Sequence, residues 1–122
     1  MNSSTIISVD KQVLGFCLNI DFFANVKNKI DRDMFDRELK DIFDTIVYAH
    51  TKYAKTITKS ELSGIFNDRN PAMPDSARNR VLDTVAELDD TPTNNDELHL
   101  DLVNNLWLRD RARQIGEKAL EI

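Results

Sequence analysis

The sequence predicts an all-α protein, a compact bundle of about six helices whose last helix is long. Three observations support this fold class. Apolar residues recur at spacings of three and four along most of the chain, which is the period of one buried helix face. Only three glycines and three prolines occur among the 122 residues. Apolar and polar residues alternate only at Thr56–Thr58, which is too short for a strand.

The composition suits one compact domain. Apolar residues make up 41% of the chain, enough to form a core, and the net charge is −5. That charge argues against a protein whose main task is to grip the backbone of nucleic acid. Cys17 is the single cysteine, so no disulfide can form within the chain, and a cytoplasmic location is expected. The sequence opens without the pattern of a signal peptide, and no apolar run is long enough to cross a membrane.

Two short helices are expected near the start of the chain. The first covers residues 9–18, and Asp21 is the expected N-cap of the second. The residues that would face inward are Val13, Leu14, Cys17 and Leu18 in the first helix, and Phe22, Phe23, Val26 and Ile30 in the second.

A third helix, capped by Asp33 or Asp36 and reaching about Tyr53, has the strongest helical periodicity. We expect it to form the centre of the core, with Phe43 and Ile46 almost fully buried. Its inward residues are Phe35, Leu39, Ile42, Phe43, Ile46, Val47 and His50.

Two further helices follow. Thr58 and Glu61 have the spacing of a capping box, in which each side chain bonds the backbone N–H of the other residue. Residues 67–75 contain two prolines and predict a loop, after which Asp75 or Ser76 begins the fifth helix. The inward residues are Leu62, Ile65 and Phe66 in the fourth helix, and Ala77, Val81, Leu82, Val85 and Leu88 in the fifth.

The last helix is expected from Asp96 to Ile122, in the same domain as the bundle of residues 1–95. At 100° per residue, its apolar residues fall on two roughly opposite faces. Leu102, Val103 and Leu106 form a face that can dock on the bundle. The candidate interface residues on the other side, with the tryptophan at the border, are Asn105, Trp107, Leu108, Ala112, Ile115, Ala119 and Ile122.

Apart from Trp107, these candidates follow one another at alternating spacings of three and four, the a/d seam of about two and a half heptads. The alanines would let a second helix approach closely, and Asn105 would fix the register. A helix that packs on its own domain has the same spacing, and this alternative stays open because the seam is short. Since the opposite face already supplies a docking surface, we expect weak self-association through the seam.

No catalytic, cofactor-binding or metal site is expected. His50 lies on an apolar helix face and suits a core or boundary histidine with one hydrogen-bond partner, whereas His99 suits a surface position near a helix start. Cys17 has apolar neighbours and suits a buried, inert thiol. The chain also lacks a glycine-rich phosphate-binding loop.

Three other groups have a structural interpretation. Gly15 and Gly64 fall inside helices, where close packing is the usual reason for glycine. Helix capping and a solvated helix face explain an acidic run: Asp31, Asp33, Asp36, Glu38, Asp41 and Asp44. Acidic residues interrupt a basic cluster, which therefore also predicts a solvated face: Arg109, Arg111, Arg113 and Lys118.

Several short segments together resemble a known family. They are Asp10–Gly15, Asp33–Phe35 followed by Ile42 and Phe43, Thr56–Thr58 with Leu62, Ala86–Leu88 followed by Thr91, Pro92 and Asn94, and Leu102, Val103, Arg109 and Ile115. In this order, over nearly the whole chain, they are similar to the N-terminal domain of DnaB-type replicative DNA helicases. Residues 70–74 stand where that family has a Gly-Gly pair, a departure that suggests a phage or otherwise distant member.

The resemblance implies a non-catalytic, all-helical collar domain. In such helicases a separate RecA-like domain binds ATP and moves the DNA. The N-terminal domains pair through helical hairpins within a hexamer and dock primase and helicase loader. This chain would supply the first arm of the hairpin, with no cofactor, no membrane contact and no direct contact with nucleic acid.

Two alternatives remain open at this point. One is a stand-alone helical adaptor or inhibitor, such as a primase-like domain that binds a helicase. The other is a DNA-binding helical domain, which a gel shift would test. A reading frame that continues past Ile122 into a phosphate-loop domain would favour the helicase over the adaptor.

Overall fold

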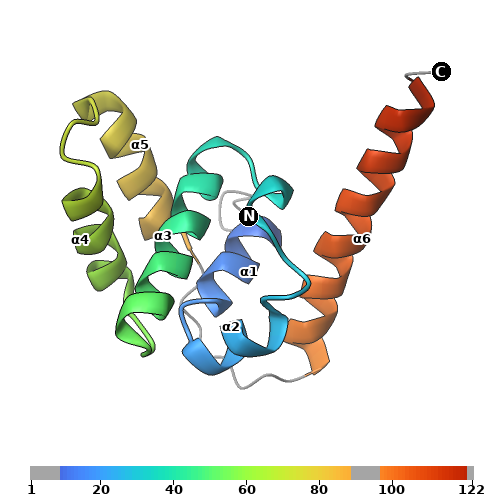
Figure 1. Ribbon diagram of the computed structural model, residues 1–122, viewed down its shortest axis with the longest axis horizontal. Helices are drawn as coiled ribbons and strands as arrows, with labels where there is room; N and C mark the ends of the chain where they lie inside the picture. Colours follow the sequence, from blue (N-terminus) through green and yellow to red (C-terminus); the bar gives the residue numbers. More distant parts are fainter. Residues whose placement is uncertain (1–8, 89–96, 121–122) are drawn as a thin grey trace, which may run out of the picture.

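The computed structural model describes residues 9–88 and 97–120, with side chains as far as residue 115. The described residues form six α-helices and one short 3-10 helix, with no strand, so the predicted fold class is confirmed (Figure 1). The elements are α1 (Val9–Phe16), α2 (Ile20–Val26), η2 (Arg32–Met34), α3 (Arg37–Tyr53), α4 (Lys59–Arg69), α5 (Asp75–Ala86) and α6 (Glu97–Leu120).

Helix α3 lies at the centre of the bundle. It packs against α1, α4, α5 and η2, while α4 and α5 pair with each other on one side (Figure 1). Phe43 is 7% exposed and Ile46 is 0% exposed, as predicted. The side chains of Leu39 and Val47 are only partly buried, because they lie at the edges of the inward face.

The first two helices begin and end at different residues from those predicted. Helix α1 ends at Phe16, where the N–H groups of Leu18 and Asn19 donate to carbonyls three residues back. Asn19, not Asp21, caps α2: its Oδ1 accepts a hydrogen bond from the Phe22 N–H at 3.0 Å. Asn and Asp are equally good caps, so residue type alone could not decide between them. Ile30 is buried but lies beyond the end of α2.

The start of α3 is preceded by a turn that the sequence did not predict. Asp31 caps η2 by accepting a hydrogen bond from the Asp33 N–H at 2.9 Å. Asp33 therefore lies within η2 and cannot cap α3. Asp36 occupies the N-cap position of α3, although its side chain makes no capping hydrogen bond.

The capping box at the start of α4 is confirmed. Thr58 Oγ1 accepts from the Glu61 N–H at 3.0 Å, and Glu61 Oε1 accepts from the Thr58 N–H at 2.9 Å. The loop after α4 is shorter than predicted, because helix continues to Arg69 and α5 begins at Asp75. Arg78 supports this turn by donating to carbonyl oxygens within it, among them that of Asn70 at 2.7 Å.

Helix α6 packs against α1 and η2, and its C-terminal end projects away from the bundle (Figure 1). Val103 and Leu106 are each 1% exposed, as expected for the docking face. The predicted turn before this helix and its first residue, Asp96, lie outside the described residues. Within the described ranges, no helix has the length and apolar content needed to cross a membrane.

Removing the Phe43 side chain should strongly destabilise the fold. Its ring stacks on Phe35 with 5.3 Å between centroids, so Phe43→Ala loses buried surface and leaves a cavity. We expect the free energy of unfolding to fall by about 3–5 kcal/mol, measured by urea denaturation followed by circular dichroism. Leu98→Ala, at a 64% exposed position, is the control. A loss for Phe43→Ala as small as that of the control would contradict the assigned core.

Candidate interaction surface

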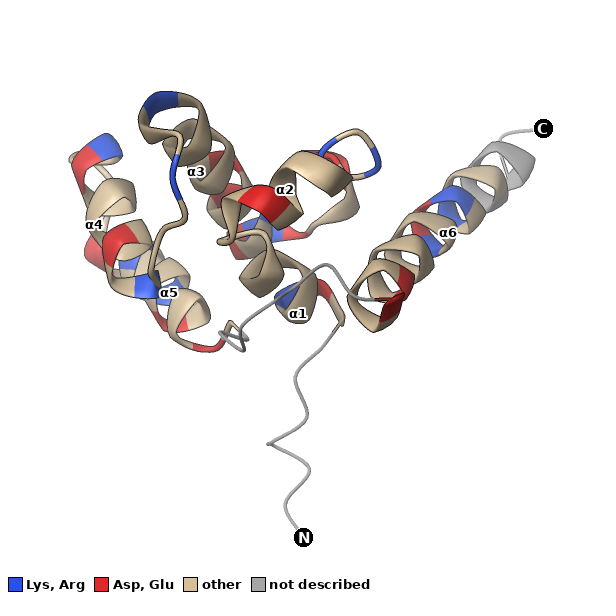
Figure 2. Ribbon diagram, turned by 90° about the horizontal axis from the view of Figure 1, so that it is seen from below, with Lys and Arg blue, Asp and Glu red and all other residues tan. Residues whose placement is uncertain are grey.

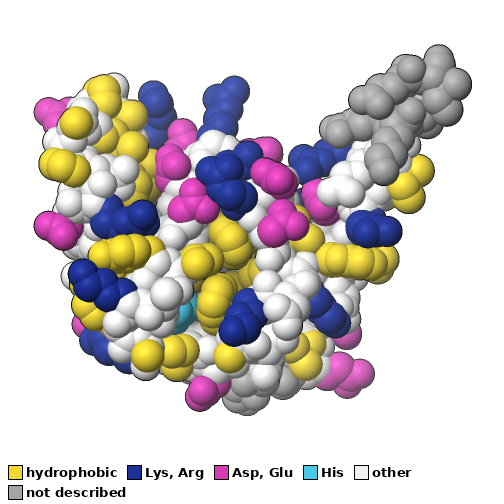
Figure 3. Space-filling model, viewed as in Figure 1, with side chains coloured by type: hydrophobic (Ala, Val, Ile, Leu, Met, Phe, Trp, Pro, Cys, Tyr) yellow, Lys and Arg dark blue, Asp and Glu magenta, His cyan; other side chains and the backbone are white. Residues whose placement is uncertain are grey.

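The second apolar face of α6 is exposed in the isolated chain. Leu108 is 57% exposed and Ile115 is 66% exposed, and Asn105 and Ala112 on the same face are also exposed. Hydrophobic side chains can be seen at the surface along this helix (Figure 3). The side chains of Ala119 and Ile122 lie outside the described residues. Four of the six seam residues therefore share one uncovered helix face, which we call the α6 seam.

Leu98 extends the α6 seam toward the start of the helix. It is 64% exposed and lies seven residues before Asn105, which places it on the same face. The sequence interpretation began the seam at Asn105 and missed it. The seven-residue spacing was the signal that could have identified it.

The opposite face of α6 is anchored on the bundle by apolar contacts. His99 contributes to them, since its ring lies 4.1 Å from the Phe16 ring and 6.3 Å from the Phe22 ring, centroid to centroid. It is only 9% exposed, so the expectation of a surface histidine is wrong. Its neighbours are far away in sequence, and only the packing of α6 on α1 brings the three rings together.

Polar contacts fix the middle of α6. Asp110 is 5% exposed, and its carboxylate accepts hydrogen bonds from Arg113 at 2.7 Å and Gln114 at 2.9 Å. Arg113 also donates to the Asp33 carbonyl oxygen at 3.0 Å, and Arg109 forms an ion pair with Asp10. The basic cluster is thus only partly a solvated face, because two of its arginines hold α6 to η2 and α1. Figure 2 shows these basic residues beyond the acidic ones at the start of α6.

Trp107 lies at the border of the α6 seam and is 36% exposed. The Arg111 guanidinium lies 5.2 Å from its ring centroid, within the range of a cation–π interaction. Trp and Arg are the residue types that contribute most often to binding energy at protein interfaces. This aromatic and cationic pair therefore borders the α6 seam.

His50 has a structural position with two neighbouring carbonyls instead of the single partner predicted. Its Nε2 lies 2.6 Å from the Cys17 carbonyl oxygen, and its Nδ1 lies 3.2 Å from that of Lys55. A neutral imidazole carries one N–H and donates to one carbonyl at a time. The shorter contact points to Nε2 as the donor. Through this hydrogen bond His50, which lies in α3, joins that helix to the end of α1.

Two residues of the acidic run make structural contacts, one as a helix cap and one in an ion pair. Asp31 caps η2, and Asp44 forms a bidentate ion pair with Arg32, with contacts of 3.1 to 3.3 Å. Burial, followed by the charge of Asp44, raises the pKa of Asp41. In the described part of the chain, no three His, Cys, Asp or Glu side chains form a group that could hold a metal ion.

In comparisons with protein-family models, curated proteins and solved structures, no match to this chain was found.

The Cys17 thiol should resist alkylation in the folded protein. It is fully buried, and burial raises its pKa from 9.0 to about 12. Because the thiolate is the nucleophile, iodoacetamide at pH 8 should modify the native chain at least ~100-fold more slowly than the urea-unfolded chain. Mass spectrometry over time measures both rates. Similar rates would show that the thiol is accessible in the native state.

The same pKa shift predicts how stability changes in alkali. The unfolded chain loses the thiol proton near pH 9, whereas the folded chain keeps it to about pH 12. The folded state therefore binds more protons in this window, and the free energy of unfolding falls as the pH rises from about 9 to about 12. Cys17→Ala lacks this proton and should show a shallower decline in urea denaturation. Parallel declines of the two proteins would contradict the shift.

Proposed function

We propose that this chain is the non-catalytic N-terminal collar domain of a DnaB-type replicative helicase, mediating oligomer assembly and docking of primase or a helicase loader. The observation that carries the proposal is the α6 seam, an apolar helix face that the bundle leaves uncovered. Its large members, Leu108 and Ile115, are more than half exposed. Water-exposed side chains of this kind in one row are typical of a surface that another chain covers.

The position of α6 supports a role in assembly. With 24 residues it is about 36 Å long, and its C-terminal end projects from the bundle (Figure 1). Its opposite face is held by Val103 and Leu106, so the α6 seam is turned outward without loss of the fold. The all-helical architecture is also the one that the resemblance implies.

An antiparallel pair of α6 helices offers a specific arrangement for the seam. With Asn105 opposite Leu108 of the second copy, Leu98 meets Ile115, so the two most exposed leucine and isoleucine side chains cover each other. Asp101 then faces Ala112, whose small side chain leaves the carboxylate open to water. The pairing is isologous, as a two-fold dimer requires.

A charge placed in the α6 seam should abolish this self-association. Ile115→Glu would bury a carboxylate against an apolar side chain in the dimer, while the monomer keeps it in water. Analytical ultracentrifugation up to millimolar concentration should detect weak dimers of the wild type and only monomers of the variant. Thr51→Glu, which adds the same charge at an exposed position of α3, is the control and should still dimerise.

Two results would remove the assembly proposal. A wild type that stays monomeric at millimolar concentration has no self-complementary seam. An Ile115→Glu variant that loses the helical circular dichroism signal would place Ile115 in the core.

The docking proposal has a separate measurement, the mass of the chain in solution with and without candidate primase. A monomer that binds an intact helicase ring would favour the adaptor.

A further inference from the structure

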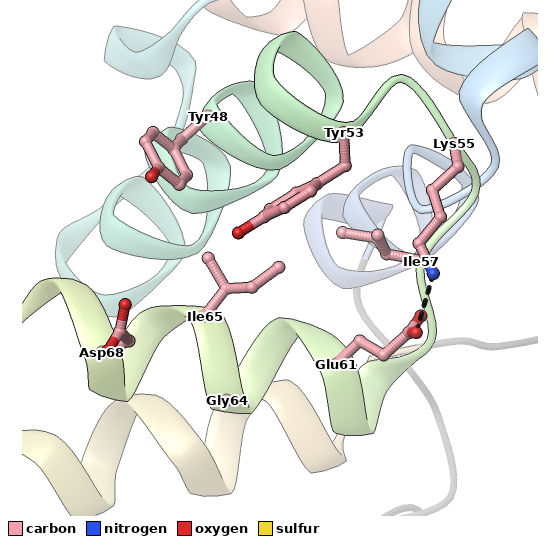
Figure 4. Close-up of a pocket in the computed structure, with 8 residues that line it drawn as sticks. All are labelled: Tyr48, Tyr53, Lys55, Ile57, Glu61, Gly64, Ile65 and Asp68. Carbon is pink, nitrogen blue, oxygen red and sulfur yellow. Dashed lines mark hydrogen bonds and ion pairs between the residues drawn. The ribbon is translucent and has the colours of Figure 1, made fainter.

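A groove lies between the C-terminal half of α3 and α4 (Figure 4). These two helices are on a different part of the bundle from α6 (Figure 1). Its volume is about 450 Å³. Tyr48, Tyr53, Ile57 and Ile65 form most of its apolar lining. The two ends are polar: a Lys55–Glu61 ion pair of 2.9 Å closes one end, and Asp68 lies at the other (Figure 4). Tyr53 is 47% exposed and Tyr48 and Ile65 are half-buried, whereas Ile57 is only 2% exposed.

Gly64 lines the groove and has no packing partner within the described chain. A Cβ built on it would meet no atom within 4 Å, so the expectation that close packing explains this glycine is wrong. Glycine destabilises a helix interior relative to alanine. The space beside it is therefore not required by the fold of α4. It is the space through which the backbone of a docked element could approach α4 closely.

Two cations lie over the rings of the tyrosines that line one side of the groove. Lys52 Nζ lies 5.6 Å from the ring centroids of both Tyr48 and Tyr53, and the Arg69 guanidinium lies 4.1 Å from that of Tyr48. The hydrogen bond that Lys52 donates to the Tyr48 hydroxyl raises the lysine pKa and favours its charged form. The charge of Asp68 also acts on Lys52, but within the described residues neither Lys52 nor Arg69 forms an ion pair, in contrast to Lys55, which is paired with Glu61.

The charged side chains that line the groove are Lys55, Glu61 and Asp68, and the first two form an ion pair. Lys52 and Arg69 do not line it but lie against its tyrosine rings, which places two cations along the tyrosine side. An apolar lining with cations along one side is complementary to a segment that has an apolar stripe and carboxylates beside it. A groove between two helices, with no strand in the described residues to extend, suits a helix better than an extended peptide.

We propose that this groove docks an acidic amphipathic helix of another protein. The apolar stripe of that helix packs on Tyr53 and Ile65, its backbone approaches Gly64, and its carboxylates face Lys52 and Arg69. The site uses no residue of the α6 seam. It therefore goes beyond the proposed function and does not depend on it.

A pair of synthetic peptides tests the chemistry of the occupant. Each is a fluorescein-labelled helix of about 18 residues with leucines at positions i, i+3, i+4 and i+7, since shorter helices are marginal in water. One carries Glu beside the leucines and the other carries Lys. Fluorescence anisotropy on the whole chain should give at least ten-fold tighter binding for the Glu peptide. In an ¹H–¹⁵N titration, the amides of Tyr53, Gly64 and Ile65 should shift.

Variants of the groove locate the site. Gly64→Leu fills the space and should weaken binding of the Glu peptide at least ten-fold, while its melting temperature should not fall, because leucine favours helix and the built Cβ meets no atom. Asn79→Leu, an exposed position on α5 outside the groove, is the matched control and should bind like wild type. Reversing both charges, Lys52→Glu with Arg69→Glu, should make the Lys peptide the tighter ligand.

Three results would overturn the proposal: no binding of either peptide at millimolar concentration, equal binding by wild type and Gly64→Leu, or amide shifts confined to α6. Ile115→Glu separates the two hypotheses. It should lose self-association and keep full affinity for the Glu peptide.

Discussion

The burial of one face of α3 is the constraint on which the rest of the structure depends. Ile42, Ile46 and Ala49 are almost fully buried on that face, and α1, α4, α5 and η2 all pack against this helix. Helix α6 instead packs on α1 and η2. The core that holds the bundle together is therefore complete with only part of α6, and the remaining length of α6 is available for contacts outside the bundle.

The direction of α6 is set by polar as well as apolar contacts. A buried carboxylate is costly unless it is paired, and Asp110 is paired with Arg113 and Gln114. Because Arg113 also reaches the Asp33 carbonyl, the same network ties the helix to η2. The hydrogen bonds of Asp110 lie within α6, so the polar links from this helix to its neighbours are the Arg113 contact with η2 and the Arg109 ion pair with Asp10 of α1. Together with the apolar face, these links hold the first two thirds of α6 against the bundle, with the α6 seam on the opposite side.

Local patterns made much of this fold predictable, and contacts between distant segments account for what was missed. The Thr58–Glu61 capping box needs only residues three apart, so its spacing was enough. The burial of His99 depends on Phe16, to which no local pattern connects it. The sequence predicted the α6 seam as a second apolar face of the last helix. Whether that face is exposed depends on which face of α6 packs on α1, and only the structure shows this. The prediction that close packing explains Gly64 was wrong, because it depends on whether another element packs beside α4. No sequence pattern shows that this side of α4 is open.

The positions of the two surfaces determine how they would act together. The groove is formed by α3 and α4. Helix α4 lies on one side of the bundle, and α6 projects on the other (Figure 1). The proposed pairing through the α6 seam would therefore leave both grooves of a dimer uncovered, and the two binding events should be additive, because they share no residue. A partner with two acidic helices, or two linked copies of one, would then engage the dimer with an effective concentration set by its linker. If the chain assembles through the α6 seam as proposed, weak contacts at several grooves would together hold such a partner more tightly than a lone chain would.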